Sequence, residues 1–308
     1  MQTRMFLTSV SAIAISAGAT EVAQAQDAGE AVGYSLSFQG TFGRLDNAPA
    51  DKWGGSGGSG GPFGGYQDKF GDPNTDMGYM GAISLERRAS PERDIRLTFS
   101  VGGSLNNDRY FSSGFSGGTV DGTVTNDLSF AAMDVEIGHH RAVGSNDLRL
   151  FAGLRGMTSS TSSDKVGSAV PGGGGLSLSE ELKFQSDFVG VGPRVGLGYS
   201  TKPAVGSFGF AGQIGAAALF GTRKDRGEFA VSSGGSSFSS GFSESGSQTV
   251  LSLDAQIGIN YYVSENSKIS AGYAAQQLWN VDVFSDSESI DVGPRLIDGV
   301  FLGFTTQF

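Results

Sequence analysis

Cysteine is absent from the 308 residues, histidine occurs only twice, and no apolar run reaches the length of a membrane helix. Without cysteine, disulfides and thiol chemistry are excluded. A membrane helix needs about 20 consecutive, mostly apolar residues. A transmembrane β-strand needs only about 9 to 11 residues with every second one apolar, so a mean hydropathy of -0.11 is compatible with a membrane barrel.

An excess of basic residues is also missing, because the formal net charge is -10 at pH 7. Proteins that bind nucleic acid need a basic surface to neutralise phosphates, so we predict no nucleic-acid partner. Proline is scarce, with 8 residues, whereas glycine (50) and phenylalanine (22) are abundant. Disordered chains rarely carry so many aromatic residues in regular alternation, so this composition indicates a folded protein.

The first residues have the pattern of an export signal. Residues 1–4 carry a positive charge, residues 5–17 are apolar and small, and Ala23-Gln24-Ala25 matches a cleavage site. We therefore predict a cleaved signal peptide over residues 1–25 and a single barrel domain over residues 26–308.

Apolar residues alternate with polar residues in many segments, which is typical of strands with one apolar face. The clearest segment is 251–263, where the odd-numbered residues form an entirely apolar set. A helix would scatter these residues around its circumference. Similar patterns predict strands over residues 32–44, 77–88, 94–105, 127–141, 147–158, 184–200, 207–221, 249–263, 268–281 and 297–308.

The segments between these strands alternate between long and short. Short turns are expected near residues 91, 144, 203 and 265, and long Gly/Ser/Asp-rich loops over 46–76, 106–126, 159–181, 222–248 and 285–295. Short periplasmic turns and long extracellular loops are typical of outer-membrane barrels. The sequence predicts an all-β fold, a transmembrane antiparallel up-and-down β-barrel of about ten strands, with eight or twelve as alternatives.

Aromatic residues are expected in two girdles at the membrane borders, since their rings prefer the level of the lipid headgroups. A C-terminal aromatic residue after a strand, here Phe308, resembles the signal read by the outer-membrane assembly machinery. The expected periplasmic girdle is Tyr34, Tyr199, Phe208, Tyr261 and Phe308, and the opposite girdle is Phe42, Tyr79, Phe220 and Trp279.

Charged residues share the faces that should point into the barrel. Charges in a small barrel must pair, because an uncompensated buried charge costs several kcal/mol. Two interpretations stay open: a structural network that plugs the interior, or the lining of a narrow polar path, for which glycines near Arg194 leave room. The expected network consists of Asp134, Glu136, Arg149, Arg155, Arg194, Asp254, Glu86 and Arg96.

Other candidate sites are weaker. His139 and His140 are adjacent and must point to opposite faces of a strand, so they cannot readily share one metal ion. We predict no metal site, no cofactor and no enzymatic activity. The basic segment 222–226 suits either contacts with lipopolysaccharide phosphates or an ordinary solvated loop base. The expected partners are outer-membrane lipid and lipopolysaccharide, together with the assembly machinery during biogenesis.

The segment Phe188-Val-Gly-Val-Gly-Pro-Arg-Val-Gly-Leu197 resembles the G-x-G-P-R-x-G motif of pore-forming major outer-membrane proteins of the Legionella type. Residues 150–155, 271–280 and 298–304 are similar to the same family, whereas the glycine-rich segment 46–76 has no match there. The resemblance implies a porin-like barrel and a role in surface adhesion.

Two functions follow as hypotheses. The first is a bacterial outer-membrane barrel of porin-like or structural character, with a narrow polar lumen for small solutes or ions. The alternative is an adhesion or ligand-binding barrel that acts through its extracellular loops. An interior blocked by paired arginine and carboxylate side chains would favour a structural or adhesive role.

Overall fold

The computed structural model describes residues 33–46, 76–105, 108–115, 118–144, 146–171, 177–201, 207–281, 284–285, 290–291 and 295–308. The predicted signal peptide (1–25) and cleavage site, the glycine-rich first loop (47–75) and most of the last loop lie outside the described residues. No helix within the described residues is long and apolar enough to cross a membrane.

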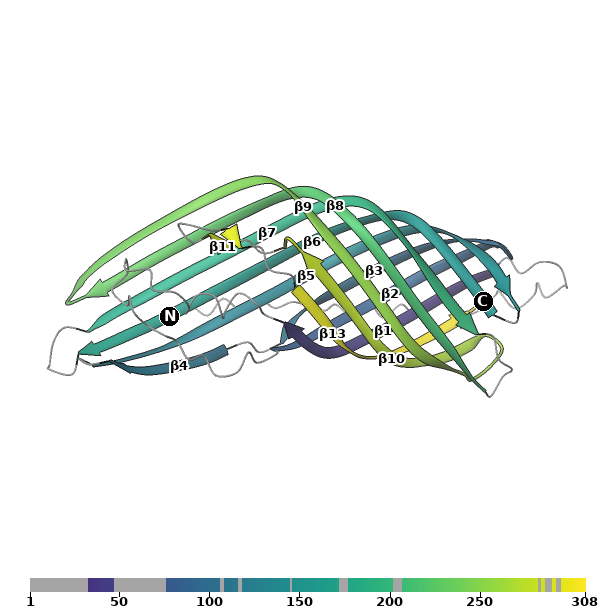
Figure 1. Ribbon diagram of the computed structural model, residues 1–308, viewed down its shortest axis with the longest axis horizontal. Helices are drawn as coiled ribbons and strands as arrows, with labels where there is room; N and C mark the ends of the chain where they lie inside the picture. Colours follow the sequence, from purple (N-terminus) through teal and green to yellow (C-terminus); the bar gives the residue numbers. More distant parts are fainter. Residues whose placement is uncertain are drawn as a thin grey trace.

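Ten of the described strands close into an antiparallel ring (Figure 1). Neighbours in the ring are mostly neighbours in sequence, β13 pairs with β1, and β3 pairs with β5 to complete the closure. The all-β barrel prediction is therefore confirmed. The ring consists of β1 (Gly33–Asp46), β2 (Asp76–Ser90), β3 (Arg93–Leu105), β5 (Gly118–Val143), β6 (Asn146–Pro171), β7 (Leu178–Thr201), β8 (Phe208–Ser233), β9 (Ser236–Tyr262), β10 (Ser267–Trp279) and β13 (Arg295–Gln307).

Five consecutive strands, β5 to β9, are 24 to 27 residues long, whereas the other ring strands have 13 to 15. Their excess length continues the sheet beyond one end of the barrel (Figure 1). We call this part the extended wall: residues 118–127 of β5, 160–171 of β6, 178–187 of β7, 222–233 of β8 and 236–249 of β9, with β4 (Asp108–Phe115) paired to β5.

The extended wall corrects the prediction of long loops over 106–126, 159–181 and 222–248. Most of these residues are paired strands, because backbone hydrogen bonds hold a sheet even where serine and glycine weaken the alternation. Gly234 and Gly235 form the two-residue turn between β8 and β9, with φ of 57° and 88°. Positive φ at both central residues is the requirement of a type I′ hairpin turn, which suits two adjacent glycines.

The opposite end of the barrel, which we call the turn end, carries short connections at residues 91–92, 144–145 and 263–266. The two ends of the ring meet there: the Tyr34 amide donates to the Phe308 carbonyl and the Phe308 amide to the Tyr34 carbonyl, both at 2.9 Å. This pairing joins the first and last strands of the ring. In outer-membrane barrels the short turns face the periplasm.

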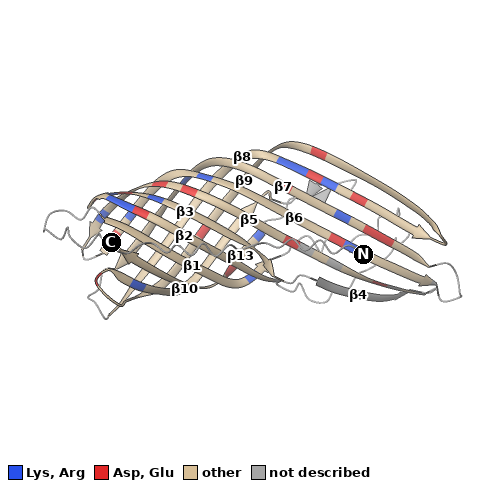
Figure 2. Ribbon diagram, turned by 180° about the vertical axis from the view of Figure 1, so that it is seen from behind, with Lys and Arg blue, Asp and Glu red and all other residues tan. Residues whose placement is uncertain are grey.

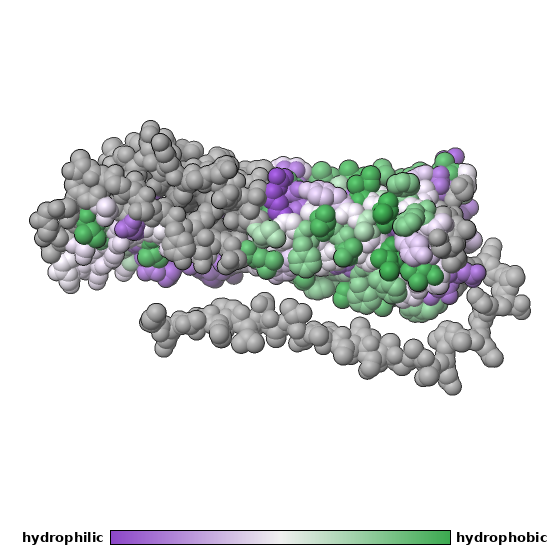
Figure 3. All heavy atoms as spheres, turned by 90° about the horizontal axis from the view of Figure 1, so that it is seen from below, coloured by the Kyte–Doolittle hydropathy of each residue, from purple (hydrophilic) through white to green (hydrophobic). Residues whose placement is uncertain are grey.

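The outer surface of the barrel is a belt of exposed apolar side chains, which gather over the half of the molecule that carries the ring (Figure 3). At the turn end the rings of Tyr34 and Phe308 stack with centroids 6.2 Å apart. Phe208 faces Tyr261 on the neighbouring strand with centroids 5.1 Å apart. Exposed side chains of this belt that match the expected girdles are Tyr34, Tyr199, Phe208, Tyr261 and Phe308, and toward the extended wall Phe42 and Phe220. Tyr79 pairs in register with Phe42, and Trp279 with Leu251. The function of these rings as membrane anchors stays a prediction.

An apolar layer also lies inside the barrel, on the side of the extended wall. Phe188, Leu219 and Val250 are fully buried there, although alternation predicts a mainly polar inner face. Their strands are long enough to pass from the polar part of the lumen into this layer. Its other members are Ala132, Met157, Ala217, Leu278 and Val281, with a second group of Leu45, Leu128, Phe130 and Ile297.

Candidate functional site

The candidate site is a network of charged side chains inside the ring, between the turn end and the apolar layer. Alternation along each strand aims these residues inward, and the strand register brings opposite charges together. Asp134 of β5 lies opposite Arg155 of β6, and Glu86 of β2 lies opposite Arg96 of β3. Charged positions of both signs recur on neighbouring strands of the barrel (Figure 2).

Arg194 on β7 is one centre of the network. Its Nη1 and Nη2 lie 2.5 and 2.7 Å from the two carboxylate oxygens of Asp254, and its Nε lies 2.8 Å from Oε1 of Glu136. The side chains of Arg194 and Glu136 are each 2% exposed. Such fixed two-point contacts are the geometry in which a guanidinium compensates buried carboxylates.

Arg155 is a second centre. Its Nε and Nη2 each lie 2.7 Å from a carboxylate oxygen of Asp134, and its Nη1 donates to the Ser252 hydroxyl at 2.7 Å and to Asp254 at 3.0 Å. Asp254 therefore joins the contacts of Arg155 to those of Arg194.

Arg149 extends the network toward the turn end. It donates to both oxygens of Asp94, at 2.7 and 2.8 Å, and to Oε2 of Glu136 at 2.9 Å. Asp94 is on β3 and Arg149 on β6, so the pair reaches across the intervening strand β5. Gly138 of β5 permits this, because a Cβ there would collide with the Asp94 carboxylate and the Arg149 guanidinium.

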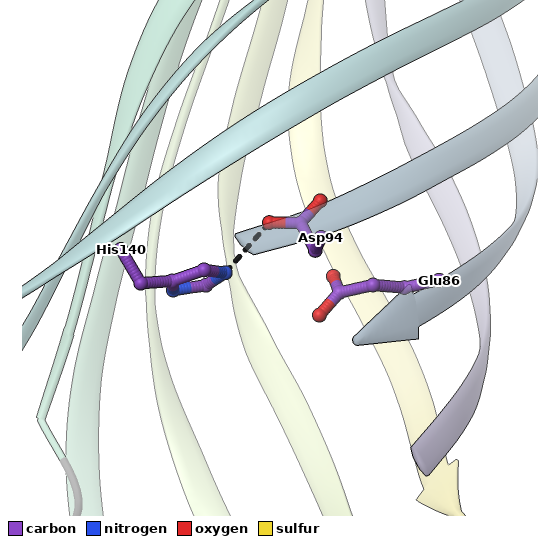
Figure 4. A group of neighbouring side chains, drawn as sticks. All are labelled: Glu86, Asp94 and His140. Atoms are coloured by element: carbon purple, nitrogen blue, oxygen red, sulfur yellow. Dashed lines mark hydrogen bonds and ion pairs between the residues drawn. The ribbon is translucent and has the colours of Figure 1, made fainter. Parts of the chain in front are cut away.

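His140 completes the network at the turn end, where it points toward Asp94 and Glu86 (Figure 4). Its Nε2 lies 2.6 Å from Asp94 and its Nδ1 lies 2.8 Å from Asp147. His139, in contrast, is exposed on the outer face, as the alternation of a strand requires.

Glu86, Asp94 and His140 place one possible ligand atom each within 4.8 Å of one another, a spacing that a metal ion could use. Both carboxylates are already engaged, however, since Arg149 binds Asp94 and Arg96 donates to Glu86 at 2.5 and 3.0 Å. A cation would have to displace these guanidinium groups. The arrangement therefore fits a self-compensated hydrogen-bond network better than a metal centre.

The structure brings all eight residues of the predicted network into ion pairs or hydrogen bonds: Asp134, Glu136, Arg149, Arg155, Arg194, Asp254, Glu86 and Arg96. Sequence reasoning missed Asp94, His140, Asp147 and Ser252. Asp94 and Arg96 are alternate residues of β3 and therefore face the same side of the sheet, so alternation was sufficient to predict Asp94 as an inward residue. Its position at the start of the predicted strand concealed it.

Part of the room expected beside Arg194 is occupied, at Gly196. The Phe151 ring lies against Gly196, where a Cβ would collide with it. The guanidinium carbons of Arg149 and Arg194 lie 4.9 and 5.4 Å from the centroid of that ring. Contacts of this kind between cations and a ring face are attractive, so the ring fills space and supports both charges.

The basic segment 222–226 lies within strand β8, which corrects the alternative of a solvated loop base. Arg223 pairs with Asp225 at 2.7 Å, and Arg226 lies 3.8 Å from Asp187. Contacts of this segment with lipopolysaccharide stay a prediction.

A row of buried oxygens lies beyond the apolar layer. Thr161, Ser186 and Asp225 are register neighbours on β6, β7 and β8, and each has a buried oxygen without a hydrogen-bond partner. Buried water usually serves such groups.

The sequence was compared with known families and structures. The family model described as the Legionella pneumophila major outer membrane protein precursor matches residues 72–291, which is well over half of the chain. The chain belongs to this family. It is an outer-membrane protein with a β-barrel fold, and the suspected resemblance is confirmed. Comparison with curated proteins finds no match.

Solved structures are similar to this member of the Legionella major outer membrane protein family only at low sequence identity. The outer membrane protease OmpT from Escherichia coli is 13% identical, with 90% of this chain and 96% of that chain covered and a TM-score of 0.35. OmpT of Vibrio cholerae is 6% identical, with coverages of 91% and 99% and a TM-score of 0.17. The siderophore receptor PirA from Pseudomonas aeruginosa is 9% identical, with coverages of 89% and 80% and a TM-score of 0.15. At these TM-scores none of them informs the function of this family member.

Proposed function

We propose that this protein is an outer-membrane barrel with a closed interior, which acts by presenting its extended wall outside the cell as a binding or adhesion surface. The observation that carries this proposal is that two layers of buried side chains lie inside the ring. Arg149, Arg155 and Arg194 are buried against carboxylates, and an apolar layer containing Phe188 and Leu219 lies beyond them.

Each layer opposes ion flow for a different reason. Carboxylates and guanidinium groups that satisfy one another leave few free groups to replace the hydration shell of an ion. An apolar constriction excludes water and gates by dewetting. An interior of this kind supports the structural or adhesive hypothesis over a permanently open pore.

A narrow porin-like path is the second candidate. It is favoured by the charged character of the network around Arg194, which could admit ions if the ion pairs rearrange. The two candidates differ in conductance, because only the second requires ions to cross the barrel.

The test is single-channel recording on the purified protein in planar lipid bilayers, with insertion verified by heat-modifiable gel mobility. We expect no conductance steps between -100 and +100 mV, roughly the range in which a charge gains or loses about 2.3 kcal/mol across the membrane. We expect the Arg194→Ala variant to be less stable and equally silent. Steady ion-selective conductance in the wild type, with selectivity altered by Arg194→Ala, would support the porin-like path and overturn the closed barrel.

A further inference from the structure

The part of β9 in the extended wall has a strand neighbour on only one side among the described residues. β9 pairs with β8 from Ser236 to Tyr261, but its pairing with β10 begins only at Leu251. The edge from Ser236 to Val250 is therefore open within the part of the chain that the structure describes. β-strands of an outer-membrane barrel avoid such edges inside the membrane, and this one belongs to the extended wall, beyond the ring.

The structure ends the β9–β10 pairing at a defined residue. Asn280, which follows β10, has a positive φ of 63° and turns the chain away from the sheet. Its side chain donates to the Thr249 carbonyl at 3.2 Å, and its own carbonyl accepts from Gln248 at 3.2 Å. The next residue, Val281, is buried in the apolar layer inside the barrel. The chain that follows β10 thus turns away from β9 where the open edge begins.

The open edge lacks the features that usually protect exposed edge strands. Proteins blunt such edges with lysine, proline or bulges. Residues 236–249 contain no proline, lysine or arginine, and Glu244 is their only charged residue. All residues from 236 to 247 are exposed, so the described residues leave both faces of this strand accessible.

The two faces of the open edge differ in chemistry. Phe238 and Phe242 are 63% and 53% exposed and share the inner face with Glu244, whereas the other face from 237 to 247 contains only serine and glycine. The Phe242 ring lies against Gly227 of β8, and its centroid is 6.2 Å from that of Phe184 of β7. A strand added to this edge would place every second side chain beside Phe238 and Phe242.

We propose that residues 236–247 of β9 bind an extended peptide by antiparallel strand addition, and that the peptide is uncharged or nearly so, with apolar residues on the face that meets Phe238 and Phe242. Backbone groups that pair with no described strand supply the hydrogen bonds, and the two phenylalanine rings select apolar side chains. This inference names the partner class of the extended wall, and it rests on the proposed function in requiring that the wall face outward.

A second copy in the same membrane is the less suitable occupant. Copies in one membrane share the same orientation, so β9 of one copy would run parallel to β9 of the other. Parallel pairing is slightly less stable per residue, and a free peptide is not restricted in this way. The same edge sequence supplies a suitable probe, because antiparallel pairing of residues 236–244 with themselves sets Phe238 opposite Phe242 and makes cross-strand aromatic pairs.

The experiment measures fluorescence anisotropy of a labelled synthetic peptide of residues 236–247 with the full-length protein in phospholipid vesicles. Two further peptides carry N-methyl groups on alternate backbone amides. One is methylated on the even-numbered residues and the other on the odd-numbered residues. Only one set of amides faces β9 in an added strand, so we expect one peptide to bind at least about tenfold more weakly than the other. Saturable binding with this difference supports the proposal, and no binding, or equal binding of both, overturns it.

Protein variants provide a second readout. Phe238→Lys puts a charge on the inner face of the edge, and we expect peptide affinity to fall at least about tenfold. Val166→Lys is the matched control, since Val166 is an exposed apolar residue of the same wall on β6 that pairs with β5 on one side and with β7 on the other. Equal loss in both variants, or in neither, overturns the proposal. A conducting barrel that still binds the peptide overturns the closed interior and supports this inference, whereas a silent barrel that binds no peptide overturns this inference alone.

Discussion

Arg149 and Asp94 form a two-point ion pair across a strand to which neither belongs. Their atoms lie 2.7 and 2.8 Å apart, and Gly138 lies between them on β5. A side chain at position 138 would occupy the space through which the arginine reaches the aspartate. The interior network thus depends on a residue that contributes no charge to it.

We expect Gly138→Ala to lower the stability of the barrel by about 3–5 kcal/mol, because separating a buried ion pair leaves uncompensated charges. The measurement is urea unfolding in lipid vesicles, followed by tryptophan fluorescence and gel mobility. Gly156→Ala is the control, since a Cβ at residue 156 meets no atom within 4 Å. Equal midpoints for the two variants would show that Arg149 reaches Asp94 without needing the space at Gly138.

Two buried hydroxyls, one in the charged network and one in the extended wall, differ in their partners, and we expect opposite effects from removing them. Ser252 accepts a hydrogen bond from Arg155 at 2.7 Å, so Ser252→Ala should cost about 1.5–3 kcal/mol. Thr161 has no partner for its hydroxyl, so Thr161→Val, which keeps the shape, should leave stability unchanged or raise it by about 1 kcal/mol. The same unfolding assay compares them, and a loss in Thr161→Val as large as that in Ser252→Ala would contradict the assignment.

The β8–β9 hairpin depends on glycine at its turn. Gly235 has φ of 88°, where a residue with a Cβ is strained by about 1–2 kcal/mol. We expect Gly235→Ala to loosen the end of the extended wall without affecting the ring, and limited proteolysis of protein in vesicles should then cleave near residue 234 faster. Gly246→Ala, whose Cβ meets no atom within 4 Å and whose φ is ordinary, should be cleaved at the wild-type rate. Cleavage that is slow in both variants would argue that other contacts hold the hairpin.

The predicted role of Phe308 in assembly can be separated from its packing. Phe308→Ala removes the ring that stacks on Tyr34 but keeps the backbone bonds between these residues. We expect a several-fold lower yield of folded barrel in the outer membrane, measured by the heat-modifiable fraction of fractionated cells. Leu302→Ala, on the outer face of the same strand and 69% exposed, should assemble normally. If both variants lose yield equally, general loss of apolar belt surface explains the effect, and a specific role of Phe308 is wrong.

Ten ring strands and their inward charges could be predicted because a strand has a period of two. Parity alone assigned Arg194, Asp254 and Glu136 to one interior. Alternation could not predict that Nη1 and Nη2 of Arg194 both bind Asp254. The strands β7 and β9 are not neighbours, so the distance between them depends on the curvature of the ring.

The extended wall shows where sequence reasoning failed. Residues 236–249 are rich in serine and glycine and have weak alternation, which is typical of loops as well as of strands exposed on both faces. Pairing with β8 and the turn at Gly234 decided between these possibilities. The adjacent glycines were the signal for a hairpin, but glycine is so frequent in this chain that the signal was not distinctive.

The sequence by itself determined the all-β class, the approximate strand number, the faces on which charges lie, and the family through its glycine and arginine motif. These properties depend on residues near one another along the chain. Only the tertiary structure decided which charges pair across strands, that the Phe151 ring occupies the space beside Gly196, and that β9 has an open edge among the described residues. Those properties depend on the distances between strands that are remote in sequence, and these distances are set only when the ring closes. The order of apolar and polar residues along the chain does not contain them.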